Sequence, residues 1–280
     1  MKFERHFLSL MIVTCIILTT GIVKAQEFPI AVGSDTTFGS AGVFDGTNYL
    51  AGILGDNISQ YSITAQLISP TGNLVGNRIL ISNSNTFTAF GIAFDGSNYL
   101  MVWRDSNSNV NGRFINPSGN LVGESFTITT NVYAQYMMSH GIAFGDSTYL
   151  VVFVKDSAYI YGQLVSKGGN LIGGQIQISS NYAREISLAY DGTNYLIAWV
   201  EKIPSSDKDI YGQFVSKTGS LVGSNFLIDG GPYESGNPTS LAYDGTRYLL
   251  AFHETPDTNS KWVLFARFIT TTGTIEETIV

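Results

Sequence analysis

The sequence predicts an all-β fold built from five copies of one four-stranded unit, and three observations support this prediction. First, a hairpin signature recurs five times, in its most regular form as Ala-Tyr-Asp-Gly-Thr-Asn-Tyr-Leu at Ala189–Leu196. Second, the tyrosines of the five copies lie 50, 50, 46 and 53 residues apart, which sets a period of about 50. Third, each period holds four apolar runs of strand length separated by turn residues. The tyrosines are Tyr49, Tyr99, Tyr149, Tyr195 and Tyr248.

Four strands per repeat are typical of a propeller blade, and a blade must pack against neighbours because it cannot bury both of its faces alone. We therefore predict a five-bladed β-propeller of four-stranded antiparallel blades. The repeats span about 40–82, 90–130, 140–180, 186–229 and 239–280. Phe28–Val32 and Thr274–Val280 both resemble a fourth strand, so we expect pairing of the terminal strands to close the ring. An incomplete ring that pairs with another chain is the alternative.

The elements of one blade are clearest in the fourth repeat. Its first strand, Ser187–Tyr190, has small side chains and suits an innermost position near a crowded axis. Asp191-Gly192 follows as a tight turn, because glycine accepts positive backbone angles at little cost. The second strand, Tyr195–Glu201, is apolar on both faces, which indicates that neighbouring blades cover it on both sides.

In the third strand, a small residue is followed directly by a glutamine or an arginine. In the fourth repeat these are Gly212 and Gln213, and the small residue is expected to let a large side chain pack against bare backbone. The polar residue either satisfies buried backbone groups or forms a ligand-binding column. A Gly-Asn-Leu-Val-Gly turn, as at Gly72–Gly76, leads to the fourth strand. The polar residues of the column are Gln66, Arg113, Gln163, Gln213 and Arg267.

Residues 1–25 are typical of a secretory signal peptide. Lys2 and Arg5 precede an apolar stretch, Phe7–Ile22, and Val23-Lys24-Ala25 suits a cleavage site. Residues 26–280 show no linker or shift in composition and are expected to form a single propeller domain. The formal net charge of −7 disfavours nucleic acid and anionic membrane as partners. The sequence thus predicts a secreted, periplasmic or extracellular protein with no membrane association after cleavage.

Variation among the repeats is concentrated on one face. The first-to-second and third-to-fourth strand turns are nearly uniform, whereas the other two connections vary and fall on the opposite side of the disc. Loops on a rigid scaffold often bind ligands, and tyrosines next to carboxylates suit sugar rings. The alternative is that these acids cap strand ends. The candidate binding residues are Asp105, Tyr133, Tyr136, His140, Asp156, Tyr182, Glu201, Tyr233, His253 and Glu254.

Catalytic and metal-binding signatures are weak in this sequence. His140 and His253 have no second histidine or cysteine at ligand spacing, so we expect no metal site and no cofactor. A glycoside hydrolase needs two carboxylates on either side of one linkage. The first strands of the repeats carry none, and only Glu185 and Glu234 lie shortly before them.

The repeats resemble a group of secreted bacterial propeller-like proteins. The shared units are Asp-Gly-Thr-Asn-Tyr-Leu, Asp-Ile-Tyr-Gly-Gln and Gly-x-Leu-Val-Gly, over about Ser40–Val280. The fifth repeat departs from this pattern at Trp262–Arg267. The resemblance implies an extracellular propeller. Because many members of the group have no known activity, it implies a fold and a location more than a function. The function predicted from the sequence is non-catalytic recognition of a glycan or an extracellular protein on the variable face. A glycoside hydrolase or lyase with an axial site and a structural matrix component are the alternatives.

Overall fold

The structure is a computed structural model that describes residues 29–30, 41–56, 59–83, 88–132, 141–155, 159–202, 208–230, 235–254 and 263–276. These residues form five four-stranded antiparallel sheets whose strands follow chain order. The first two sheets contain β1 Gly42–Phe44, β2 Tyr49–Asp56, β3 Ser59–Ile68, β4 Leu74–Ser82, β5 Thr88–Phe94, β6 Tyr99–Arg104, β7 Val110–Ile115 and β8 Leu121–Thr129. The others contain β9 Ile142–Gly145, β10 Thr148–Lys155, β11 Tyr159–Ser166, β12 Leu171–Gln177, β13 Ala183–Tyr190, β14 Asn194–Lys202, β15 Lys208–Ser216, β16 Leu221–Asp229, β17 Ser235–Tyr243, β18 Arg247–Glu254, β19 Val263–Thr270 and β20 Ile275–Glu276. Across these ranges, no helix is long and apolar enough to cross a membrane.

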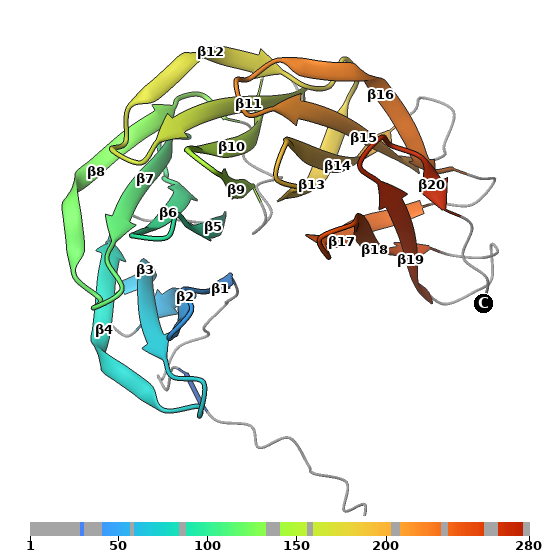
Figure 1. Ribbon diagram of the computed structural model, residues 1–280. Coiled ribbons are helices and arrows are strands. Elements are labelled where there is room, and N and C mark those ends of the chain that lie inside the picture. Colours follow the sequence, from blue (N-terminus) through green and yellow to red (C-terminus); the bar gives the residue numbers. More distant parts are fainter. Residues whose placement is uncertain are drawn as a thin grey trace, which may run out of the picture.

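The five sheets are the blades of a β-propeller. In Figure 1 they follow one another around an arc, with β1, β5, β9, β13 and β17 on the inner side and β4, β8, β12 and β16 on the outer side. The predicted fold class, five four-stranded antiparallel blades, is confirmed.

Closure of the ring through the termini remains a prediction. The fifth blade has its own fourth strand, β20, and no ladder among the described residues joins the first sheet to the last. Residues 31–40 and 277–280, which would take part in such pairing, lie outside the described residues, and Pro29 and Ile30 belong to no strand. The side chain of Tyr49 on β2 is 45% exposed, whereas its four counterparts are buried. This exposure agrees with an end of the arc that no described strand covers.

The second strands of the second, third and fourth blades each contribute to two cores, one on each face of the strand. On β14, Tyr195, Ile197 and Trp199 join the side chains of β10 in a cluster between the third and fourth blades. Leu196 and Val200 point the other way, into the cluster between the fourth and fifth blades. The predicted cover on both sides is confirmed for the fourth repeat, whereas on the second strands of the two end blades Tyr49 and Leu249 are exposed.

In the second and fourth blades, the glycine of the third strand makes room for a side chain of the fourth strand. A Cβ added at Gly212 would lie 2.9 Å from both the Phe226 ring and the Ile228 side chain, and one at Gly112 would lie 2.9 Å from Phe126. Such approaches are far inside ordinary contact distance. The predicted packing against bare backbone is therefore confirmed, and it takes place within one blade.

The glutamines next to these small residues satisfy backbone carbonyls. Each Nε2 donates to a carbonyl of the neighbouring fourth strand at 3.0–3.1 Å, within the same blade. Buried polar groups of this kind are costly if they have no partner, so the column stabilises the pairing of the third and fourth strands. The pairs are Gln66 with Val75, Gln163 with Ile172 and Gln213 with Val222. The backbone-satisfying interpretation of the column is confirmed for the glutamines.

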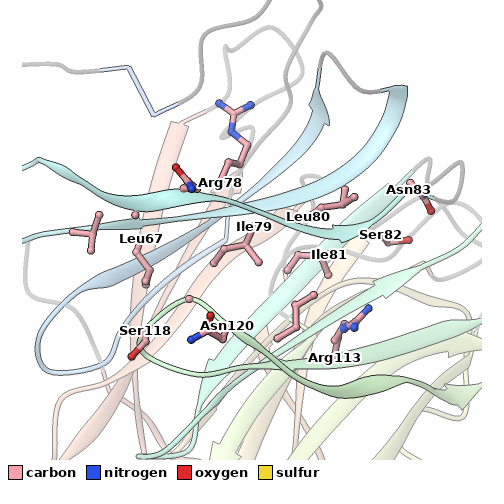
Figure 2. A pocket seen from close by; sticks show the side chains of 15 residues that line it. Leu67, Arg78, Ile79, Leu80, Ile81, Ser82, Asn83, Arg113, Ser118 and Asn120 are labelled. Atoms are coloured by element: carbon pink, nitrogen blue, oxygen red, sulfur yellow. The ribbon is translucent and has the colours of Figure 1, made fainter.

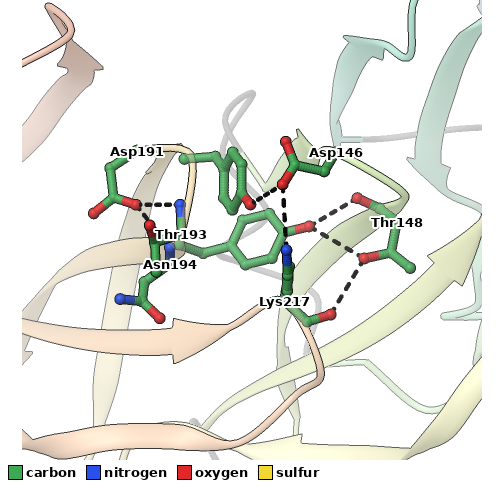
Figure 3. A network of polar contacts seen from close by, with 8 residues as sticks. Asp146, Thr148, Asp191, Thr193, Asn194 and Lys217 are labelled. Carbon is green, nitrogen blue, oxygen red and sulfur yellow. Dashed lines mark hydrogen bonds and ion pairs between the residues drawn. The ribbon is translucent and has the colours of Figure 1, made fainter.

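A second set of hydrogen bonds links neighbouring blades on the face that carries the turns between first and second strands. In the second to fifth blades, the tyrosine near the start of the second strand donates its hydroxyl proton to the preceding blade, at or next to its first-to-second strand turn. Figure 3 shows one such network, in which Asp146 also pairs with Lys217 at 3.6 Å. The four bonds run from Tyr99 to Asp45 Oδ2 (2.6 Å), Tyr149 to Asn98 O (3.2 Å), Tyr195 to Thr148 O (2.7 Å) and Tyr248 to Asn194 O (3.3 Å).

These tyrosine hydroxyls are expected to make the protein sensitive to alkaline pH. Burial, followed by the neighbouring Asp95, raises the pKa of Tyr149, and burial raises the pKa of Tyr195 to about 12. Because an unfolded tyrosine has a pKa of about 10, the unfolded chain releases its protons first. The stabilisation is thus complete below about pH 10 and is lost as the pH rises through the folded values. Urea midpoints measured at increasing pH should fall more steeply for the native chain than for Tyr149→Phe, and equal slopes would contradict the assignment.

Candidate functional site

The predicted binding residues that the structure describes lie where second strands end or where the chain enters a first strand. Tyr133, Tyr136, His140, Asp156 and Tyr233 lie outside the described residues. The side chain of Glu254 is also not described, although its backbone pairs with Val263 in the fifth blade. His253 is half-buried on β18, opposite Leu264. The sites of the remaining candidates, Asp105, Tyr182 and Glu201, can be described in detail.

Asp105 organises the loop between β6 and β7. Its Oδ1 accepts hydrogen bonds from the amides of Asn107 and Asn109 at 2.9 Å, and its Oδ2 accepts from the side-chain amides of Asn109 and Asn111 at 3.1 and 2.9 Å. Burial raises the pKa of the carboxyl group, but these hydrogen bonds outweigh it and the net shift is downward. The carboxylate therefore holds its own turn together, as in the strand-capping alternative.

Glu201 is a buried carboxylate at the end of β14. Only 4% of the residue is exposed. Its Oε1 accepts a short hydrogen bond from the side-chain amide of Asn181, and its Oε2 accepts one from the Trp199 indole at 3.3 Å. Asn181 lies in the connection between β12 and β13, so Glu201 links that connection to the second strand.

Two tyrosines lie near this buried group: Tyr211 is close enough to feel the Glu201 charge, and Tyr182 follows Asn181 in the chain. Tyr182 and Tyr211 are half-buried, and both pack against the core cluster that contains Trp199. The Tyr211 and Trp199 rings are stacked, with centroids 6.5 Å apart and planes 24° from parallel. Burial raises the pKa of Tyr211, and the charges of Asp209 and Glu201 add to this effect. The result is an aromatic surface next to a carboxylate and an amide, between the third and fourth blades.

A groove of about 470 Å³ lies on the rim next to this group. Gln177–Ser180 and Gln213 are among its lining residues. Ser179 holds two chain segments together at the edge of this groove. Its Oγ atom accepts a hydrogen bond from the Ile160 amide at 2.8 Å and donates one to the Asn181 carbonyl at 3.2 Å. We call Asn181, Tyr182, Glu201 and Tyr211 the blade 3–4 site. The sequence prediction included Tyr182 and Glu201 but missed Asn181 and Tyr211, since Tyr211 matched the repeated strand pattern.

The inner strands offer little for a catalytic site at the axis. Within their described residues, Glu185 on β13 is the single carboxylate, and Glu234 lies outside the described residues. Glu185 is 9% exposed and has a φ of 56°, a left-handed conformation that is uncommon for a residue with a side chain. The described residues contain no group of three or more histidine, cysteine, aspartate or glutamate side chains that could bind a metal ion.

Comparisons with known proteins agree on the fold. No protein-family model and no curated protein matches this chain. Among solved structures, the chain is similar to the β-propeller domain of the Trilobed protease from Pyrococcus furiosus, with a TM-score of 0.53 and 14% identity over 86% of this chain and 71% of that one. It is also similar to a protein described as TolB from Agrobacterium tumefaciens (TM-score 0.54, 14% identity, 85% and 79% covered).

A third similar structure is an α-L-arabinofuranosidase from Clostridium thermocellum, with a TM-score of 0.51 and 11% identity over 86% of this chain and 93% of that one. At identities this low the likeness establishes the architecture and leaves the activity open. The chain is thus a β-propeller, a class that includes both enzymes and domains of other kinds.

Proposed function

We propose that this protein is a secreted, non-catalytic propeller that binds carbohydrate at the blade 3–4 site. The observation that supports this proposal is the half-buried pair Tyr182 and Tyr211 next to the Glu201 carboxylate and the exposed Asn181 amide. Sugar C–H groups pack on aromatic rings, while sugar hydroxyls need fixed donors and acceptors. Glu201 and Asn181 hold each other in place, so the site requires little rearrangement to bind a ligand.

The architecture supports binding rather than hydrolysis. Hydrolysis of a glycosidic bond uses two carboxylates about 5–10 Å apart. In the described part of the inner strands, Glu185 has no second carboxylate on a neighbouring strand. The similarity to an arabinofuranosidase makes a carbohydrate-related role for this fold reasonable. The signal-like segment at 1–25 supports secretion, which mass spectrometry of the exported protein would test by locating its N-terminus near residue 26.

The proposal predicts that Tyr211→Ala weakens sugar binding. A panel of neutral oligosaccharides, screened on an array and followed by calorimetry, should contain at least one ligand. We expect Tyr182→Ala and Tyr211→Ala each to weaken its binding about tenfold, since a ring contact contributes roughly 1 kcal/mol.

Tyr161→Ala is the matched control, because Tyr161 occupies the same third-strand position in the third blade. Its substitution should leave binding unchanged. Absence of any ligand, or equal affinity for all three variants, would contradict the proposal. Release of shorter sugars from the panel would instead support the hydrolase or lyase alternative. Self-association without sugar binding would support a matrix component.

A further inference from the structure

A larger groove lies on the outer rim between the first and second blades. It has a volume of about 840 Å³ and runs between β4 and the turn that follows β7. Figure 2 shows Ile79 and Ile81 extending from β4 toward Ser118 and Asn120 on the opposite side. The groove thus has an apolar floor with amide and hydroxyl groups along its edge. It is separate from the blade 3–4 site.

Arg113, at one end of this groove, has few partners for a side chain that is only 19% exposed. One of its terminal nitrogens, NH2, donates to the Gly123 carbonyl at 3.4 Å and lies 3.7 Å from the carboxylate of Glu124. Glu124 is 95% exposed, so water screens this ion pair strongly. The Nε of Arg113 is buried and has no hydrogen-bond partner among the described residues.

The equivalent position in the fifth blade shows how an arginine of this column can be paired. Arg267 donates through Nε and NH2 to Oδ1 of Asp229 at 3.1 and 2.7 Å, and the Asp229 side chain is only 6% exposed. Asp229 is the last residue of the fourth strand of the preceding blade. Paired hydrogen bonds of guanidinium to carboxylate are strong and directional.

The residue that corresponds to Asp229 in the first blade is Ser82, the last residue of β4. Ser82 and Arg113 line the same groove, and Figure 2 shows the Arg113 guanidinium on the side of the groove where Ser82 and Asn83 lie. Before the third and fourth blades, whose column residue is a glutamine, this position holds the neutral residues Thr129 and Ser179. Arg113 is therefore the arginine of the column with a serine at the position where Arg267 has a carboxylate.

We propose that this groove binds an acidic saccharide, with Arg113 holding the carboxylate of a uronic acid in the place that Asp229 occupies beside Arg267. The groove suits the remainder of a sugar, because Ser118 and Asn120 can bond hydroxyl groups and the half-buried Val75 and Leu121 offer an apolar surface to the ring. Arg113 offers a local positive charge to the sugar carboxylate, although the protein as a whole has a net charge of −7. The inference does not depend on sugar binding at the blade 3–4 site.

Calorimetry with short oligomers of galacturonate, glucuronate and mannuronate, each compared with its methyl ester, tests the proposal on the folded chain. We expect at least one acid to bind and its ester to bind at least tenfold more weakly. Arg113→Gln, which installs the glutamine of three other blades, should weaken binding about 10- to 100-fold, as expected for a hydrogen-bonded charge.

Ser82→Asp is the sharper variant, because it supplies the internal carboxylate that Arg267 already has. It should abolish binding of the acid while preserving or raising the melting temperature. Arg267→Gln and Tyr182→Ala are controls that should leave binding of the acid unchanged, and the second distinguishes this site from the blade 3–4 site.

Three outcomes would overturn the proposal: no acid binds, the ester binds as tightly as the acid, or Ser82→Asp retains full affinity in a folded protein. Tighter binding of a glutamate-rich peptide than of any uronate would also overturn it, since the groove would then be assigned to a protein partner.

Discussion

Trp199→Ala is expected to lower the free energy of unfolding by about 3–5 kcal/mol, the usual cost of removing a large aromatic side chain from a core. Trp199 is fully buried between the third and fourth blades. Its removal opens a cavity against Ile197 and Tyr211 and also takes away the indole donor of Glu201. Chemical denaturation at neutral pH would measure the loss, and a change below about 1 kcal/mol would contradict this description of the core.

The second blade supplies a matched control for the hydrogen-bonding part of this effect. Trp103 is 3% exposed, and its Nε1 has no hydrogen-bond partner among the described residues. Trp199→Phe should therefore cost about 1 kcal/mol more than Trp103→Phe, because it alone leaves a buried carboxylate oxygen without its donor. Equal losses would indicate that the Trp199–Glu201 bond contributes nothing to stability.

The repeats explain why the architecture could be predicted from the sequence. Five copies of the same pattern, each with a second strand that is apolar on both faces, leave neighbouring blades as the only cover for residues such as Leu196 and Trp199. The small residue of each third strand, glycine in three copies and alanine in two, could also be given a packing role, because it precedes a glutamine or an arginine in all five copies. Repetition thus supplied the internal comparison that a single sequence normally lacks.

The candidate site was predicted less well, for physical reasons that particular residues show. Glu201 and Asp105 occupy similar positions at the ends of second strands. Nothing in that spacing indicates that Glu201 is buried and bonded to Asn181, or that the Asp105 carboxylate accepts its hydrogen bonds from its own loop. The hydrogen-bond partners of these side chains depend on which connecting loop packs over the end of the strand. Ser82 and Arg113 illustrate the same limit, since their place on one groove follows from the contact of successive blades.

The third blade provides a case in which the repeat pattern and the structure make opposite predictions. Four blades begin their hairpin turn with Asp-Gly, whereas the third has Gly145-Asp146. A repair of this turn to the common pattern, Gly145→Asp with Asp146→Gly, would be expected to stabilise the protein if the repeats were interchangeable. It would also replace Asp146, whose φ of 54° lies in the left-handed region, by glycine.

The structure predicts that this repair destabilises the protein by about 1–3 kcal/mol, as overpacking of a tight site does. A Cβ at position 145 would lie 2.5 Å from the Tyr195 hydroxyl oxygen, because that hydroxyl reaches past the turn to donate to the Thr148 carbonyl at 2.7 Å. The change would also remove the hydrogen bond from Tyr190 to Asp146. Gly145 is thus fixed by Tyr195 of the next blade rather than by its own turn.

Denaturation of the double variant, with Asp146→Gly alone as its control, separates the two interpretations. The single variant should lose less stability than the double one, since glycine relieves the left-handed backbone while the Tyr195 contact stays intact. If the double variant were as stable as the native chain, Tyr195 would have moved to bond the new carboxylate as Tyr99 bonds Asp45. The blades would then be interchangeable at this junction, and the hydrogen bond from Tyr195 to the Thr148 carbonyl would add no stability beyond that of the common pattern.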